Sequence, residues 1–121
     1  MISFTKLLKI IENGEGLHTE FKLKFPEYDK IAKTAIAFAN TDGGNIIFGI
    51  ADDKTIVGVD SEKEIEQLFE YVNQEFCFPQ IEYSIQSIEY KKNNKEIVIV
   101  NIPVSKNRPI KLKDGYDKIS P

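Results

Sequence analysis

Two short and nearly continuous apolar runs constrain the fold of this chain more than any other feature. The first covers residues 45–50 and the second covers residues 97–100. Short runs of this kind, rich in β-branched residues, are typical of strands that are buried on both faces. Such strands need a covering layer on each side, so the two runs predict the centre of a sheet with helices packed against it.

The spacing of apolar residues elsewhere predicts the elements around these central strands. Helical spacing predicts helices over residues 6–12, 30–39 and 62–76, and alternation predicts strands over residues 17–24, 55–59 and 81–90. The resulting order is a helix followed by β-α-ββ-α-β-β. This order predicts an α+β fold, in which a mixed sheet is flanked by helices in a single layered domain.

The strand over residues 81–90 changes its apolar phase partway along. Ile81, Tyr83 and Ile85 share one phase, whereas Ile88 and Tyr90 occupy the other. A one-residue insertion in a strand produces such a shift, so the pattern predicts a β-bulge near Gln86-Ser87.

Length and composition place the chain among single-domain proteins. The 121 residues suit one domain spanning residues 1–121. A hairpin turn is expected at Asp114-Gly115, and only a few residues follow it. We therefore expect residues 105–121 to be an incomplete basic tail, and the chain to be an N-terminal fragment of a longer protein. The single cysteine, Cys77, has no internal disulfide partner, which predicts a cytoplasmic location. Because no apolar run approaches the roughly 20 residues that span a bilayer, we expect no membrane partner.

Charge is distributed unevenly along the sequence. Residues 1–90 contain eight Lys and 16 Asp or Glu, whereas residues 91–121 contain eight Lys or Arg and three acidic residues. This asymmetry predicts either a solvated tail or a basic surface that contacts nucleic-acid phosphates. The candidate phosphate contacts are Lys91, Lys92, Lys95, Lys106, Arg108, Lys111 and Lys113.

Two segments resemble the Schlafen AlbA-like domain family. Residues 14–22 read GEGLHTEFK, and residues 37–53 read AFANTDGGNIIFGIADD, followed by Val57-Gly58. The family shows an E-x4-E-F-K strand, an A-F-A-N-T-x-G-G helix exit and a G-I/V-x-D hairpin that ends in Gly. The similarity runs from about Leu7 to Arg108. It implies a nucleic-acid-binding domain, more often for DNA than for RNA and often part of a transcription regulator.

The same resemblance implies a second activity, because some relatives cut RNA with three carboxylates. Those positions correspond to Glu15, Glu20 and Asp52 in this chain. Hard oxygen ligands suit Mg²⁺ or Mn²⁺, and such ions activate water for phosphodiester cleavage. Lys22 completes an E-x-K pattern with Glu20 and would stabilise transition-state charge. The alternative interpretation is that Glu20 and Lys22 are exposed strand neighbours and that Asp52 lies in a hairpin turn.

Three hypotheses for function follow. The first is a DNA-binding, regulatory module, and the second is a divalent-metal-dependent endonuclease that uses the three carboxylates and Lys22. The third is a structural module that forms a homodimer through an uncovered sheet edge. A nuclease would use Mg²⁺ or Mn²⁺, and the sequence indicates no other cofactor. The chain has no Walker-type G-x4-G-K sequence, so its glycines do not indicate nucleotide hydrolysis.

Overall fold

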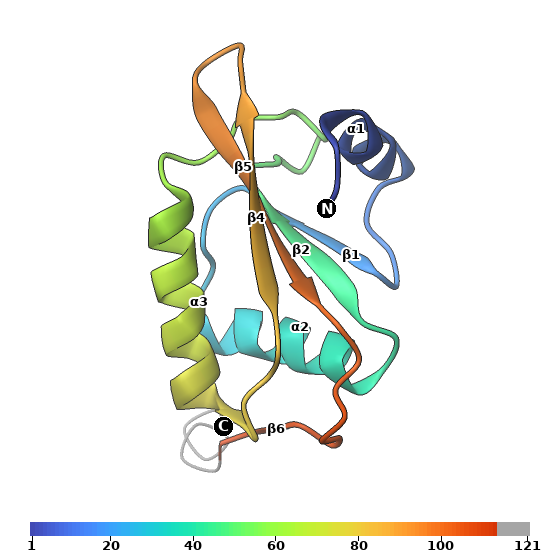
Figure 1. Cartoon of the computed structure of the whole chain (residues 1–121), viewed down its shortest axis with the longest axis vertical. Helices are drawn as coiled ribbons and strands as arrows, with labels where there is room; N and C mark the ends of the chain where they lie inside the picture. Colours follow the sequence, from blue (N-terminus) through green and yellow to red (C-terminus); the bar gives the residue numbers. More distant parts are fainter. Residues whose placement is uncertain (114–121) are drawn as a thin grey trace.

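The computed structural model describes residues 1–113, which form helices on both faces of a mixed sheet (Figure 1). The helices are α1 (Phe4–Asn13), α2 (Tyr28–Asn40) and α3 (Glu62–Phe76). The strands are β1 (Thr19–Lys22), β2 (Gly44–Phe48), β3 (Cys77–Phe78), β4 (Ser84–Tyr90), β5 (Lys95–Ile102) and β6 (Lys111–Leu112). The predicted α+β class is confirmed. The hairpin predicted at Asp114-Gly115 lies outside the described residues.

The main sheet has the strand order β1-β2-β5-β4. β1 is parallel to β2, whereas β2 and β4 are both antiparallel to β5. The two apolar runs therefore become the two central strands, as their composition predicts. β3 and β6 form a separate two-stranded sheet that extends from the C-terminal end of α3.

Each face of the main sheet carries its own hydrophobic cluster. On one face α2 and α3 pack against alternate residues of the central strands, including Ile46, Val98 and Val100. On the other face α1 packs against the intervening residues, including Ile47 and Ile99. The first cluster is called the α2–α3 cluster below and the second is called the α1 cluster.

None of the helices in residues 1–113 is long and apolar enough to cross a membrane.

The change of apolar phase in β4 does not come from a bulge, so the prediction of one near Gln86-Ser87 is wrong. β4 pairs with β5 without interruption, from Ser84 opposite Asn101 to Tyr90 opposite Lys95. Ile85 packs against the α2–α3 cluster, whereas Ile88 and Tyr90 pack against the α1 cluster. The apolar residues change face because different helices cover the two halves of the strand.

The strand predicted over residues 55–59 is wrong, because these residues pair through single β-bridges and form no continuous strand. One bridge joins Ile50 to Ile56 and the other joins Val59 to Glu96. Between them, the backbones of Gly49 and Gly58 touch, and a Cβ atom on Gly49 would lie 2.7 Å from the Cα atom of Gly58. The close contact between Gly49 and Gly58 directs the chain toward β5, so residues 55–59 pair with their neighbours at isolated positions.

Candidate nucleic-acid interface

Glu15 stabilises the edge of the sheet. Its carboxylate accepts a hydrogen bond of 2.8 Å from the backbone N–H of Phe21. Because β1 is an edge strand, this N–H points away from β2 and has no strand partner. The structure therefore gives Glu15 a local role in satisfying an edge donor.

Glu20 and Lys22 lie next to each other on one face of β1. Their carboxylate and ammonium groups are 3.3 Å apart, and each side chain is 31% exposed. Phe21, between them, points into the α1 cluster on the opposite face. The E-x-K pair predicted from the sequence is thus a half-exposed ion pair at the sheet edge.

Asp52 is exposed in the turn that follows β2. Its neighbour Asp53 accepts a hydrogen bond of 3.0 Å from the Thr55 N–H, and hydrogen bonds from Thr55 lower the pKa of Asp53. Lys54 reaches from the same turn to the end of α1, where its ammonium group donates to the Glu12 carbonyl oxygen at 3.0 Å. Residues 1–113 contain no group of three or more His, Cys, Asp or Glu side chains placed to hold a metal ion.

The glycines of the family-like motifs have structural roles. Gly43 has φ of 78°, and a Cβ atom there would lie 2.8 Å from the Ile102 carbonyl oxygen. Gly44 packs directly on the ring of Phe38, where a Cβ atom would come within 2.7 Å. The two glycines let the chain leave α2 and enter β2 in close contact with β5. Asn40 of the same motif holds the backbone of Ile110 with its side-chain amide.

The seven predicted phosphate contacts do not form one surface. Three of them, Lys91, Lys92 and Lys95, lie in or beside the loop between β4 and β5, at one end of the long axis in Figure 1. Lys106 and Arg108 lie between β5 and β6, Lys111 lies in β6 and Lys113 follows β6, all at the opposite end (Figure 1). The basic C-terminal third is therefore split into two separate regions by the fold.

Two of these seven cations are already engaged within the protein. Lys95 forms an ion pair with Asp60, which lowers the pKa of that carboxyl group. Lys113 donates to the Gln74 carbonyl oxygen, near the C-terminal end of α3. A cation at this end of a helix interacts favourably with the helix dipole, so Lys113 has a structural role.

Lys91 and Lys92 remain available to a ligand. Both are exposed, and the ion pairs within residues 1–113 involve Lys22, Lys30 and Lys95 instead. The loop that carries them is held in shape by Asn93 and Asn94. The Asn93 amide donates to the Val57 carbonyl oxygen at 2.9 Å, and the Asn94 N–H donates to the Tyr90 carbonyl oxygen at 2.9 Å. The fold thus presents two free ammonium groups on an ordered hairpin.

A hollow of about 510 Å³ lies beside this loop. It is lined by Phe4, Ile88, Glu89, Tyr90, Lys91 and Lys92. The Phe4 and Tyr90 rings have centroids 6.3 Å apart and planes inclined by 30°. The sequence analysis does not identify Phe4 as part of a site. Phe4 lies one turn before Leu7 on an amphipathic helix, and this position does not by itself indicate that the ring is exposed.

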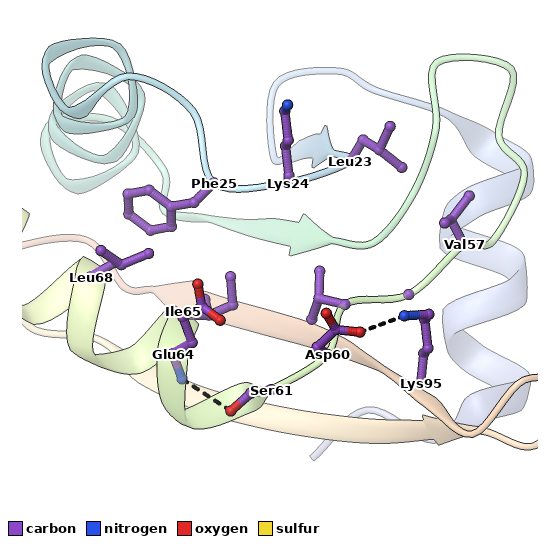
Figure 2. Close-up of a pocket in the computed structure, with 12 residues that line it drawn as sticks. Leu23, Lys24, Phe25, Val57, Asp60, Ser61, Glu64, Ile65, Leu68 and Lys95 are labelled. Atoms are coloured by element: carbon purple, nitrogen blue, oxygen red, sulfur yellow. Dashed lines mark hydrogen bonds and ion pairs between the residues drawn. The ribbon is translucent and has the colours of Figure 1, made fainter.

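A second hollow, of about 270 Å³, lies between the segment that follows β1 and the start of α3 (Figure 2). Leu23, Phe25, Val57 and Leu68 supply apolar surface there. The charged groups in its lining are Lys24, Lys95, Asp60 and Glu64, and Figure 2 shows the Lys95–Asp60 pair. Because positive and negative groups are balanced, this hollow does not favour an anionic ligand.

The surface of α3 is acidic. This helix contains five Glu and one Lys, and most of these Glu side chains are exposed. A phosphate backbone is repelled by such a surface. The features that favour nucleic acid therefore concentrate at the β4–β5 loop and not along α3.

The structure is a layered α+β domain with a basic hairpin at the β4–β5 loop and an acidic face on α3. The Schlafen, AlbA_2 family matches residues 15–119, so the chain belongs to this family. The resemblance seen in the sequence is thereby confirmed.

Among solved structures, the chain is similar to the N-terminal domain of a Nitrosomonas europaea protein named as related to the ATP-dependent DNA helicase RecG, determined by solution NMR. The TM-score is 0.72 and the identity is 22%, over 93% of this chain and 82% of that one. At this identity the similarity establishes the shared fold. No curated protein matches the chain.

Proposed function

We propose that this chain is a nucleic-acid-binding domain that contacts phosphates through the β4–β5 loop, and that it binds DNA as part of a regulatory protein. The observation that carries the proposal is the pair of exposed ammonium groups, Lys91 and Lys92, on a loop fixed by Asn93 and Asn94. Membership of the Schlafen, AlbA_2 family supports nucleic acid as the ligand, and the choice of DNA follows from the family resemblance, which implies DNA more often than RNA. Lysines on an ordered loop contact phosphates with little dependence on base sequence.

The proposal is tested by measuring the binding of fluorescein-labelled DNA and RNA by anisotropy over a range of salt concentrations. Release of counterions makes log K fall linearly with log salt, and each phosphate contact contributes about 0.9 to the slope. The double variant Lys91→Ala/Lys92→Ala should lower the affinity and reduce the slope by about 2.

A matched control separates a local contact from a general effect of net charge. Lys33 and Lys63 are also exposed, but they lie on α2 and α3. The variant Lys33→Ala/Lys63→Ala changes the net charge by the same amount and should leave the slope unchanged. Equal losses in the two double variants would contradict a specific contact at the loop. A third variant, Lys106→Ala/Arg108→Ala, tests the basic region at the opposite end in the same assay.

The nuclease hypothesis remains a second candidate, and the observation that favours it is the 3.3 Å pairing of Lys22 with Glu20. A lysine beside a carboxylate is the arrangement that the E-x-K pattern requires. Glu15, Glu20 and Asp52 are not grouped to hold a metal ion in the described structure. The hypothesis therefore requires them to be brought together around Mg²⁺ or Mn²⁺, which would supply the activation of water. Labelled RNA and DNA incubated with either ion provide the test. Cleavage that disappears in Glu20→Ala/Asp52→Ala supports the hypothesis, and absence of cleavage by the wild type rejects it.

A further inference from the structure

The hollow beside the β4–β5 loop combines aromatic surface with positive charge. Phe4, in the first turn of α1, is 39% exposed although the next inward-facing residue of the helix, Leu7, is fully buried. Its ring lies over the end of β4, where Tyr90 is half-buried. Lys91 and Lys92 follow Tyr90 directly and line the same hollow. Ring surface and phosphate-binding groups therefore occur within one site.

Three charged side chains line the hollow beside the Phe4 and Tyr90 rings. Glu89 also lines the hollow, but it alternates with Ile88 and Tyr90 along β4. Since successive side chains of a strand point to opposite faces, the Glu89 carboxylate projects away from the face that carries Tyr90. Lys91 and Lys92, in the turn that follows β4, add two cations to the lining of the hollow against this one carboxylate, so the net charge of the lining favours an anion.

We propose that this hollow binds one base of a single-stranded nucleic acid, with the base stacked on Phe4 and Tyr90 and the adjacent phosphates on Lys91 and Lys92. This inference rests on the proposed function and specifies its ligand. Aromatic side chains beside a basic surface are the arrangement by which proteins bind single strands, because every base has a face that can stack. Bases within a duplex are stacked on one another and cannot reach the rings.

The experiment compares a labelled single strand with a hairpin duplex of the same length, both measured by anisotropy at low salt. The variant Phe4→Leu keeps an apolar side chain but removes the ring. We expect it to weaken binding of the single strand by a factor between about 5 and 150, with little effect on the duplex. Leu8→Ala is the matched control, because Leu8 is 43% exposed on the same helix and does not line the hollow. It should leave both affinities unchanged.

A direct readout comes from tyrosine fluorescence, which is not masked because the chain contains no tryptophan. A stacked base should quench part of the tyrosine emission of the wild type. In Tyr90→Phe the ring remains, so binding of the single strand should persist while that part of the quenching disappears. The unfolding curves of Phe4→Leu and Tyr90→Phe should match that of the wild type. A match would show that a loss of binding does not come from unfolding of the variant.

The outcomes separate this inference from the proposed function. Loss of affinity in Lys91→Ala/Lys92→Ala with no effect of Phe4→Leu overturns the stacking site and leaves phosphate binding by the loop intact. A duplex bound as tightly as the single strand also overturns it. Absence of binding to any DNA or RNA by the wild type rejects both proposals together.

Discussion

The side-chain amide of Asn40 makes two hydrogen bonds with the backbone of Ile110, 70 residues further along the chain. Asn40 Nδ2 donates to the Ile110 carbonyl oxygen at 2.9 Å, and the Ile110 N–H donates to Asn40 Oδ1 at 2.8 Å. The amide therefore substitutes for a strand partner and fixes the segment between β5 and β6 against the end of α2. Asn73 holds Ile81 in the same way, at 2.8 and 2.7 Å.

Replacing Asn40 should lower the stability of the whole domain. Asn40→Ala removes two hydrogen bonds and leaves both backbone groups of Ile110 without their partner, which should lower the free energy of unfolding by about 2 kcal/mol. Urea unfolding at neutral pH measures the change. Asn107→Ala is the matched control, because Asn107 is exposed and, among residues 1–113, its backbone N–H but not its side chain is engaged. Equal unfolding midpoints for the two variants would contradict the bridging role of Asn40.

The close contact between Gly58 and β5 provides a second prediction about the stability of the fold. Gly58 has φ of 81°, and a Cβ atom there would lie 2.6 Å from the Cβ atom of Lys95. Gly58→Ala should therefore destabilise the protein by about 1–3 kcal/mol from backbone conformation alone, and the steric clash adds to this. Gly16→Ala serves as the control, since a Cβ atom on Gly16 meets nothing within 4 Å. Thermal unfolding should show a clearly lower Tm for the first variant and little change for the second.

The sequence predicts the central strands and α3 well because their patterns depend on burial. Residues 46–48 and 97–100 are apolar since both faces of β2 and β5 are covered. The N-cap of α3 is Ser61, whose side chain accepts from the Glu64 N–H. One misread feature is the segment 55–59, which forms isolated bridges instead of a strand. The other is β4, where the phase of apolar residues depends on which helix covers each half. That information lies in the packing of α1 and α3, far away in sequence.

The candidate site was predicted less completely for a related reason. Sequence position groups the basic residues into one C-terminal arm, but the chain crosses the whole molecule along β5 between Lys95 and Lys106 (Figure 1). Phe4 belongs to the site only because α1 packs over the end of β4. Asn40 and Asn73 are polar residues in helices, and no local pattern distinguishes a backbone-bridging amide from a solvated one.

Glu15 allows the stabilising effect of a hydrogen bond to be separated from that of a charge. Its carboxylate accepts the Phe21 N–H, and a Gln side chain can also accept this bond. Glu15→Gln should unfold at nearly the same urea concentration as the wild type, whereas Glu15→Ala should lose about 1 kcal/mol. Identical losses in the two variants would show that the charge, not the hydrogen bond, stabilises the edge of β1.

Cys77 should be inert in the folded protein. The thiol is buried at the end of α3, and burial raises its pKa to about 12, although the charge of Lys113 acts in the opposite direction. Because the thiolate is the reactive form, a thiol reagent at pH 8 should modify Cys77 only after denaturant is added. The release of chromophore from an aromatic disulfide reagent, with and without urea, measures this. Rapid modification of the native protein would contradict the burial of the thiol.

The ion pair between Asp60 and Lys95 should make stability depend on pH in a defined direction. The hydrogen bond and the charge of Lys95 hold the pKa of Asp60 below its ordinary value of 3.8. A carboxyl group with a lower pKa in the folded state stabilises that state above its unfolded pKa, and the contribution disappears as the pH falls through the folded value. Asp60→Asn should therefore be less stable than the wild type at neutral pH, and the difference should shrink as the pH falls below 3.8 and vanish once it is below the folded-state pKa.

Urea unfolding at several pH values measures this difference, and high salt should reduce it because the pair is exposed. Asp42→Asn is the control, since Asp42 is exposed and has no ion pair within the described residues. A stability difference for Asp60→Asn that stays constant from neutral to acid pH would rule out the ion pair as its source. Because Lys95 also ends the β4–β5 loop, loss of the pair should free its ammonium group and slightly strengthen the binding of nucleic acid at low salt.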